Sequence, residues 1–338
     1  MTEARPTSRC AVVGAGAVSQ IVHLPILCER IDVEVMGVVD VDQHKAATVA
    51  GRFQVGRVMS FEEVLEDETL DAVVLCTPNH LHERQTIAAL EAGKHVFTER
   101  PLAIDSEGVE RILAVAREAE GVLVVGLPHR FRPEVTALKS FVASGDLGDI
   151  YAMRGSWLTR EVRRKRATWR DDPKRSGGGA LMELGIPALD LCLWMAGYPT
   201  VDRVSCTLHN GETPVEDAAS IQASTSDGAV LSVEVSNQYF AGDDRFYARL
   251  MGTEGSGSIP PLTVYRKLGG RPLDVTPIQP RPRGGENPYT NAYRRHLDHF
   301  VRAIHGEAEA PLPEEQLLLL RLIEAAYRSA DSGEEISL

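Results

Sequence analysis

The chain has 338 residues, which at about 150 residues per domain suggests two domains. Its 43% hydrophobic and 25% charged residues are typical of a water-soluble globular protein. The formal net charge of −12 at pH 7 argues against a general affinity for nucleic acid or for anionic membranes. We find no apolar run near the roughly 18 residues of a membrane span and no signal-peptide core at the N-terminus, so we expect no membrane partner.

The five cysteines lie far apart in the sequence and form no CxxC pair. An odd, scattered set inside apolar segments is typical of buried thiols in a reducing compartment. We therefore expect a cytoplasmic protein without disulfides. We also expect no metal site, because the histidine pairs at 80/82 and 296/299 have no carboxylate partner beside them. The five thiols are Cys10, Cys28, Cys76, Cys192 and Cys206.

Residues 9–126 repeat a pattern of a short apolar run, a turn and an amphipathic stretch. The apolar runs are rich in valine and nearly continuous, as in parallel strands buried on both faces. Helical stretches such as 80–92 and 105–119 separate them. This alternation predicts a doubly wound parallel sheet in a first domain of residues 1–128. The predicted strands are 10–14, 33–39, 70–76, 94–98 and 122–126.

The pattern changes from residue 129 onwards. A helix at 133–143 and a strand at 149–158 precede an arginine-rich stretch and an apolar helix at 179–196. Runs of strands with turn signals follow, and they indicate a second α/β domain, residues 129–338, built on a largely antiparallel sheet. These strands are 201–209, 216–225, 229–237 and 245–251, followed by a predicted long loop at 269–288 and helices at 289–305 and 313–330.

The sequence GAGAVS, residues 14–19, lies where the first strand turns into the first helix. Its first glycine permits a tight turn, and its second lets the backbone approach a pyrophosphate at the helix N-terminus. Asp40 ends the second strand about 20 residues later, where a carboxylate binds both ribose hydroxyls and repels a 2′-phosphate. This context predicts a Rossmann dinucleotide site that takes NAD, with NADP less favoured. The predicted contacts in the glycine turn are Gly14, Gly16, Ala17 and Val18.

Four further motifs follow in order along the chain: CTPNHLH at 76–82, GKHVFTERP at 93–101, HRFRP at 129–133 and GGGALMELGIPALD at 177–190. Taken together they resemble the Gfo/Idh/MocA family of glucose–fructose oxidoreductase and inositol 2-dehydrogenase, and the resemblance runs essentially from end to end. It implies hydride transfer between a nicotinamide and a carbinol carbon of a sugar or polyol. It also implies a C-terminal domain whose open sheet mediates the contacts of a homodimer or homotetramer.

The resemblance assigns roles to several residues near the cofactor. It implies that Thr77, Pro78 and Asn79 line the path of the cofactor. It also implies that Glu99 contacts the nicotinamide ribose. The next residue is Arg100, where the family usually has a lysine that bridges the nicotinamide ribose and a substrate hydroxyl.

The helix after the glycine triplet departs from the family pattern as well. Glu183 stands where the family usually has an aspartate, and Pro187 stands where it has the histidine that acts as general acid and base. Proline has no titratable group, and arginine, with a pKa above about 12, accepts no proton at neutral pH. We hypothesise that Glu183 carries the proton while Arg100 polarises the reacting oxygen by charge-assisted hydrogen bonds. The alternative is that Glu183 only binds the substrate or caps the structure.

Residues 154–175 carry nine basic and three acidic residues in a chain that is acidic as a whole. This excess favours an anionic substrate such as a sugar phosphate, a uronate or a nucleotide sugar. Trp157 and Trp169 are candidates for stacking on a sugar ring, and Arg130 for binding the substrate. The alternatives are a solvated loop, or an arm that pairs with acidic residues of another subunit. His129 is a weaker candidate, because a packed loop histidine is commoner.

The sequence therefore predicts an NAD-linked oxidoreductase that acts on a carbohydrate or a related alcohol or ketone. Two alternatives stay open: a lyase or hydrolase that recycles tightly held NAD, and a redox-silent regulator that kept both pockets. The changes at Arg100 and Pro187 favour the regulator. The retained glycine turn, Asp40, Glu99 and the glycine triplet argue against it.

Overall fold

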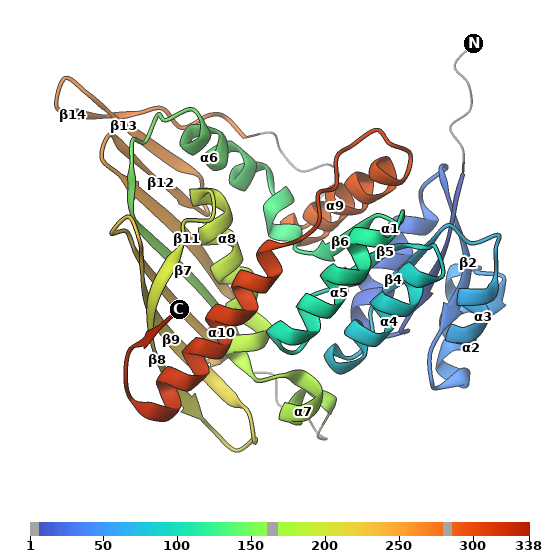
Figure 1. The fold of residues 1–338 in the computed structure, drawn as a ribbon. Helices are drawn as coiled ribbons and strands as arrows, with labels where there is room; N and C mark the ends of the chain where they lie inside the picture. The colour runs from blue at the N-terminus through green and yellow to red at the C-terminus, as the bar shows by residue number, and fades with distance from the viewer. Residues whose placement is uncertain (1–6, 161–167, 280–285) are drawn as a thin grey trace, which may run out of the picture. The chain divides into compact units, whose positions relative to one another are not determined.

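The computed structural model describes residues 7–160, 168–279 and 286–338. The chain forms two compact units (Figure 1). Unit 1 consists of Met1–Pro128 and Glu286–Gln316, and unit 2 consists of His129–Gly285 and Leu317–Leu338. The predicted division differs at the second boundary, because it left residues 286–316 in the second domain. These residues return to unit 1 because helix α9, Pro288–Ile304, adds Leu297 and Phe300 to that unit's apolar core.

Unit 1 is built on a sheet of six parallel strands in the order β3-β2-β1-β4-β5-β6. This order is that of a doubly wound sheet, as the sequence predicts. The order reverses between β1 and β4, which is where open parallel sheets bind their ligands. The strands are β1 Ser8–Val13, β2 Val33–Val39, β3 Arg57–Val58, β4 Ala72–Leu75, β5 His95–Glu99 and β6 Leu123–Gly126.

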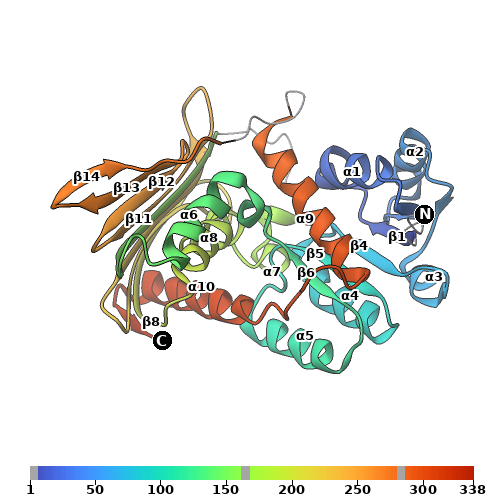
Figure 2. The ribbon, with the colours of Figure 1, turned by 90° about the horizontal axis from the view of Figure 1, so that it is seen from above.

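Helices cover both faces of this sheet. Figure 2 shows α4 and α5 on one side and α1 and α9 on the other. Side chains at the N-caps start several of them: Asp42 accepts a hydrogen bond from the backbone of Lys45, and Asp105 from that of Gly108. The helices are α1 Leu24–Cys28, α2 Gln43–Phe53, α3 Phe61–Glu66, α4 Asn79–Glu91 and α5 Ser106–Glu118.

Unit 2 is built on a nine-stranded sheet in the order β14-β13-β12-β11-β7-β10-β9-β8-β15. Only the pairing of β7 with β10 is parallel among the strand pairs described, so the sheet is mostly antiparallel, as predicted. The strands are β7 Ile150–Arg160, β8 Val201–Asn210, β9 Glu216–Thr225, β10 Val230–Tyr239, β11 Arg245–Gly252, β12 Gly255–Ile259, β13 Thr263–Leu268, β14 Arg271–Asp274 and β15 Ile336–Ser337.

The predicted loop at 269–288 is wrong at its start. Gly269 and Gly270, with φ of 57° and 78°, turn β13 back into β14. A Gly-Gly pair between two strands is a hairpin signal, but all four residues of β14 are exposed, so the strand shows no apolar alternation. Residues 280–285 of the predicted loop lie outside the described residues.

The helices of unit 2 lie on one face of its sheet, and in the described chain the opposite face carries no helix (Figure 2). The helical run Pro173–Ala196 is long and apolar enough to cross a membrane by length and composition, contrary to the expectation from sequence. However, 83% of its most apolar window is buried inside the protein, as in a core helix. The helices are α6 Pro133–Ala143, α7 Pro173–Ser176, α8 Ile186–Ala196 and α10 Glu315–Ser332.

Candidate active site

The two glycines of the turn after β1 have different surroundings. Gly14 has φ of +99°, and a Cβ there would lie 2.6 Å from the carbonyl oxygen of Cys76, so only glycine fits. A Cβ on Gly16 would meet no heavy atom within 4 Å. Gly14 is therefore needed for packing, whereas an added Cβ at Gly16 would point into open space. Ala17 is exposed and Val18 half-buried where the helical turn begins.

Asp40 lies beside this turn at the carboxyl end of β2. Its carboxylate accepts hydrogen bonds from the backbone of Ala15 at 2.8 Å and of Asp42 at 3.0 Å, and from Lys45 Nζ at 2.8 Å. Partial burial alone would raise the pKa of Asp40, but these three donors outweigh it and hold the pKa below its usual value. The carboxylate is thus ionised and fixed in position, and Lys45 is a neighbour that the sequence analysis missed.

The segment Thr77–Asn79 follows β4 on the other side of the switch point. Thr77 Oγ1 donates to Gln85 Oε1 at 2.5 Å. The buried ring of His82 contacts the carbonyl oxygens of Thr77 at 2.8 Å and Pro101 at 2.7 Å. His82 therefore packs and links two loops, and within the described residues no group of His, Cys, Asp and Glu could hold a metal.

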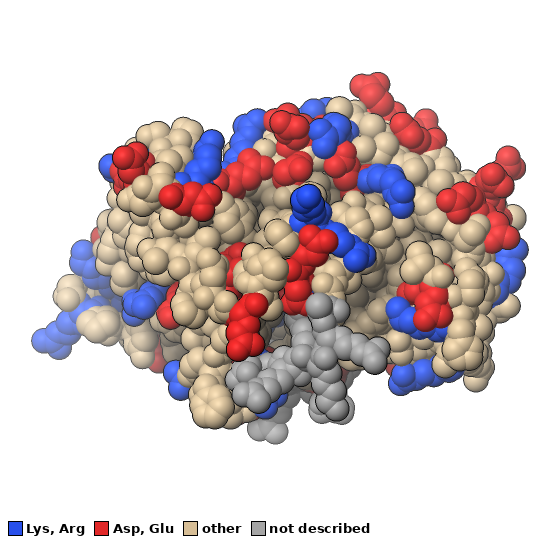
Figure 3. Space-filling view, turned by 90° about the horizontal axis from the view of Figure 1, so that it is seen from below, with Lys and Arg blue, Asp and Glu red and all other residues tan. Residues whose placement is uncertain are grey.

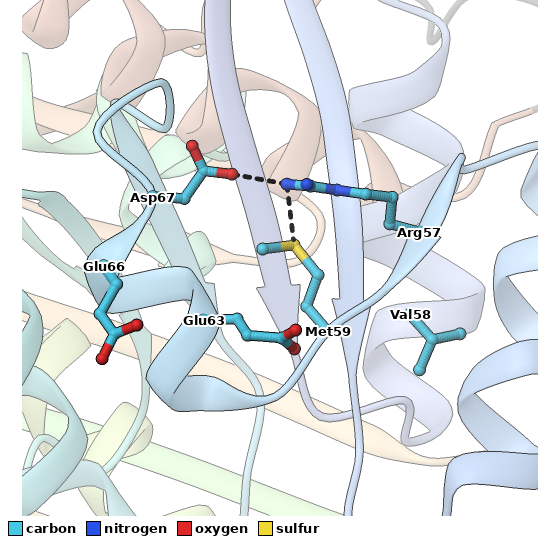
Figure 4. Close-up of a pocket in the computed structure, with 6 residues that line it drawn as sticks. All are labelled: Arg57, Val58, Met59, Glu63, Glu66 and Asp67. Atoms are coloured by element: carbon cyan, nitrogen blue, oxygen red, sulfur yellow. Dashed lines mark hydrogen bonds and ion pairs between the residues drawn. The ribbon is translucent and has the colours of Figure 1, made fainter.

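A separate hollow lies at the β3 edge of the same sheet (Figure 4). Arg57 extends across it, and its Nη2 lies 2.5 Å from Asp67 Oδ2 and 3.7 Å from Met59 Sδ. Glu63 and Glu66 also line it. With three carboxylates against one paired guanidinium, this hollow does not suit a phosphate.

Glu99 ends β5 and is buried together with two partners. Its Oε1 lies 2.7 Å from Nε2 of His23, and its Oε2 accepts a hydrogen bond of 3.1 Å from the hydroxyl of Tyr293. All three residues have less than a tenth of their surface exposed. His23 and Tyr293 were missed by the sequence analysis, since they lie 76 and 194 residues from Glu99 along the chain.

Glu183 lies in a π-helical turn, Leu181–Gly185, in unit 2. Its Oε1 is 3.5 Å from Nε of Arg170, and both side chains are partly exposed. The guanidinium of Arg170 lies 4.3 Å from the ring centroid of Trp169. The structure thus brings together Glu183, the predicted stacking residue Trp169 and one arginine of the basic stretch.

Pro187 accounts for the shape of this turn. Proline has no N–H, so residue 187 cannot donate to the carbonyl of Glu183 as an α-helix requires, and the chain widens into a π turn before α8. The same arrangement occurs in unit 1, where the π turn Ser19–His23 precedes Pro25. In both units a proline therefore follows a π turn that carries a candidate functional side chain.

The glycine triplet is clamped by a buried carboxylate. Glu216, at the start of β9, accepts backbone hydrogen bonds from Gly179 at 3.0 Å and Leu181 at 2.8 Å. Its Oε1 also accepts one of 2.9 Å from the hydroxyl of Tyr327. A Cβ on Gly179 would collide with the backbone of Glu216. Glu216 was missed by the sequence analysis, and it fixes the start of the helical run that carries Glu183.

Two family models match the chain in order. Residues 8–127 match the model described as "Oxidoreductase family, NAD-binding Rossmann fold", and residues 135–258 match the "GFO/IDH/MocA C-terminal domain". The chain belongs to the Gfo/Idh/MocA oxidoreductase family. Its first domain is therefore an NAD-binding Rossmann domain, and the open Gly16 backbone and ionised Asp40 fit that cofactor.

Relatives of this Gfo/Idh/MocA protein are named as dehydrogenases and oxidoreductases. It is 27% identical over 355 residues to D-glucoside 3-dehydrogenase of Escherichia coli (strain K12), covering 98% of this chain and 97% of that protein. It is 30% identical over 192 residues to glucose-6-phosphate 3-dehydrogenase of Bacillus subtilis (strain 168), covering 55% and 53%. The crystal structure of GenD2 from gentamicin A biosynthesis, in complex with NAD, has a TM-score of 0.85 at 26% identity and covers 98% and 97%.

Two other candidates of this family member are engaged in contacts within unit 2. Arg130 donates from Nε to Asp190 at 2.9 Å and from Nη2 to the hydroxyl of Tyr198 at 2.8 Å. His129 is buried, stacked on Phe246 at 4.5 Å and edge-on to Trp157 at 4.7 Å. The contact of Arg130 with substrate stays a prediction, and the surroundings of His129 are those of a packed histidine.

All five cysteines of this family member are free thiols. Cys10, Cys192 and Cys206 are buried, and burial raises the pKa of each to about 12, so they are inert at neutral pH. Cys28 differs from the expectation of buried thiols, because it lies exposed at the end of α1.

Proposed function

We propose that the protein transfers a hydride between NAD and a secondary alcohol of a sugar, and that it favours a sugar with an anionic group. The observation that carries this proposal is the grouping of Trp169, Arg170 and Glu183: an aromatic ring, a guanidinium stacked on it and a carboxylate paired with that guanidinium. An aromatic face suits a sugar ring, and a guanidinium suits a phosphate or carboxylate. The relative named for D-glucoside supports a sugar as substrate, and the relative named for glucose 6-phosphate supports an anionic group on that sugar.

The cofactor would be held by residues of unit 1. Bound nicotinamide supplies the hydride acceptor or donor of the reaction. The backbone of Gly14, Gly16, Ala17 and Val18 would bind the pyrophosphate, and Asp40 the adenosine ribose. Thr77, Pro78 and Asn79 would line the cofactor's path. Glu99, with Arg100 next to it, would contact the nicotinamide ribose. The preference for NAD over NADP follows from the ionised carboxylate of Asp40, which repels a 2′-phosphate.

The proton would be handled by this chain's own side chains. Oxidation of an alcohol releases one hydride and one proton, and the hydroxyl proton passes to the carboxylate of Glu183. Arg100 stabilises the negative charge that develops on the reacting oxygen. Arg170 binds the anionic group of the sugar, and Trp169 stacks on its ring. Arg130 would add a further contact to the substrate.

We also propose a homodimer or homotetramer formed through the open face of the nine-stranded sheet, in a cytoplasmic protein. The support is the family's resemblance and the exposed apolar side chains on unit 2 strands. Tyr151, Val230, Tyr265 and Leu268 are each more than 40% exposed. Light scattering of the purified protein would give the number of copies.

The test is a fluorescence titration of the purified protein with NADH and, separately, NADPH. We expect tight binding of NADH and weak binding of NADPH. Asp40→Asn should bring the dissociation constants of the two nucleotides closer together. The control is Glu62→Gln, which changes an exposed carboxylate on α3. If neither nucleotide binds, the proposed function is wrong.

A substrate panel then separates the enzyme from its alternatives. We expect NADH production with glucose 6-phosphate, or another anionic sugar, above that with neutral glucosides and inositol. NAD that copurifies without net NADH production would support the recycling lyase or hydrolase. NADH binding without turnover of any sugar would support the regulator.

A further inference from the structure

The buried carboxylate of Glu99 is held from four separate elements of unit 1. His23 comes from the π turn after β1, Tyr293 from α9, and Glu99 itself ends β5. Gly126 at the end of β6 completes the enclosure, because a Cβ there would lie 2.8 Å from Glu99 Oε2. Each carboxylate oxygen has one internal partner, so Glu99 has a single orientation in the described structure.

The charge of Glu99 is compensated within this enclosure. Burial alone would lower the pKa of His23, but Cys76 and Glu99 raise it to about 10, so the ring is an imidazolium at neutral pH. Burial alone would raise the pKa of Glu99, but His23, Arg100 and Tyr293 outweigh burial and hold its pKa below the usual value. Tyr289 adds a hydrogen bond of 3.4 Å to the hydroxyl of Tyr293.

Two aromatic rings pack against His23. The ring of His23 lies edge-on to Phe97 at 5.4 Å and to Tyr293 at 5.3 Å. Phe300 lies one ring further out: its ring packs against that of Phe97, with 5.7 Å between the ring centroids. Figure 2 shows why α9 reaches this site from late in the sequence: it lies beside α1 on one face of the sheet. The return of α9 to unit 1 thus supplies one of the two partners of Glu99.

We propose that His23 and Tyr293 are positioning residues for the nicotinamide ribose: they hold Glu99 in one orientation at the carboxyl end of β5. This inference rests on the proposed role of Glu99 in binding that ribose. A carboxylate has about four acceptor positions. Two are used by His23 and Tyr293, and the others remain for ribose hydroxyls. In this proposal both partners act on the cofactor through Glu99.

The first experiment tests the enclosure without any cofactor. NMR of protein labelled with ¹⁵N-histidine should show an imidazolium signal at pH 8 that is absent in His23→Gln. In Glu99→Gln the pKa of the same ring should fall, because the hydrogen bond and negative charge of Glu99 are gone and only Cys76 still raises that pKa. A neutral His23 in the native protein at pH 8, or a His23 pKa that is unchanged in Glu99→Gln, would overturn the inference.

The second experiment measures the dissociation constant of NADH. Tyr293→Phe keeps the ring and removes one hydrogen bond, and His23→Gln keeps an N–H donor and removes the positive charge. Each should raise the dissociation constant by about 10-fold, the loss expected for a hydrogen bond to a charged group. Phe300→Leu is the matched control: it should lower the melting temperature through lost packing and leave NADH binding unchanged.

The outcomes separate this inference from the proposed function. If the native protein does not bind NADH, the proposed function fails, and the positioning role fails with it. If the native protein binds NADH and both variants bind it equally well, only the inference fails. If Phe300→Leu weakens binding as much as Tyr293→Phe does, the effect is one of general stability and the positioning role is wrong.

Discussion

Nε of Arg170 lies 3.5 Å from Oε1 of Glu183, and its guanidinium stacks on Trp169. In the absence of substrate the arginine therefore has a carboxylate as its partner, and an anionic sugar would compete for the same guanidinium. We expect Arg170→Gln to raise KM for glucose 6-phosphate several-fold and to leave KM for a neutral glucoside unchanged. Steady-state kinetics at low and high salt would measure this.

The matched control for Arg170 is Lys174→Gln, which removes a charge from the same segment, four residues further along. If both variants raise KM equally, the general positive charge of the segment attracts the substrate rather than the stacked arginine. An unchanged KM in Arg170→Gln would remove the argument for an anionic substrate. Arg163, Arg164, Lys165 and Arg166 lie outside the described residues.

The two kinds of glycine in this chain lead to opposite predictions. Gly16→Ala adds a methyl group where no heavy atom lies within 4 Å, so stability should stay the same. The methyl group should instead occupy the space proposed for the pyrophosphate and raise the dissociation constant of NADH by about 10-fold or more. Gly179→Ala drives its methyl group into the backbone of Glu216, which should cost about 1–3 kcal/mol of stability.

Thermal unfolding and NADH titration of both glycine variants would check these expectations together. A stable Gly16→Ala protein that binds NADH normally would show that the pyrophosphate is not bound at this turn. A Gly179→Ala protein with unchanged stability would show that the backbone at Glu216 shifts to admit the methyl group at little cost.

Much of the fold follows from local sequence. Strands buried on both faces, such as Ala72–Leu75, read as continuous valine-rich runs, and Asp105 marks the start of α5 by its capping side chain. The strands that the sequence did not reveal are β3, β12, β13, β14 and β15. β3 and β15 have two residues each, β12 consists of glycine and serine up to its last residue, and β13 and β14 are exposed along most or all of their length. The period of apolar residues carries no information where neither face is buried.

The candidate site was predictable where one motif contains it and not where the fold assembles it. The glycine turn and Asp40 lie in one βαβ unit, so spacing alone indicates them. Tyr293 reaches Glu99 from 194 residues away, and Glu216 reaches Gly179 from 37. Such pairs depend on how α9 and β9 pack, which no local pattern encodes. The π turns differ from these distant pairs, because each has a local feature in the sequence: a proline two residues after it.

The clamp at Glu216 predicts a loss of stability in unit 2. Glu216→Gln replaces one acceptor oxygen by an NH₂ group facing the backbone N–H groups of Gly179 and Leu181, so about 1–3 kcal/mol of stability should be lost. Tyr327→Phe removes a single hydrogen bond and should cost about 1 kcal/mol. Urea unfolding measures both, with Glu234→Gln on the exposed side of β10 as the control. Equal stabilities of Glu216→Gln and the control would contradict the clamp.

The ion pair of His23 and Glu99 predicts how stability depends on pH. The native pKa of His23, about 10, lies above its ordinary value of 6.5, so its contribution is complete below pH 6.5 and is lost as the pH rises towards 10. The pKa of Glu99 is lowered, so its contribution is lost only as the pH falls below its usual range. Between pH 7 and 8.5 the free energy of unfolding should therefore fall by about 1.4 kcal/mol for each pH unit. This is the value for one proton that is bound only in the native state.

This pH window separates His23 from the buried thiols. Cys10, Cys192 and Cys206 also have raised pKa values, but their ordinary value is 9.0, so they reduce stability only as the pH approaches and passes 9. Urea unfolding at pH 7.0, 7.75 and 8.5 should show the slope in the native protein and in His44→Gln, which changes an exposed histidine on α2. His23→Gln should flatten the slope. If the free energy of unfolding changes with pH in the same way in His23→Gln and in the native protein, His23 is neutral in the fold. Glu99 is then held without a positive charge on His23.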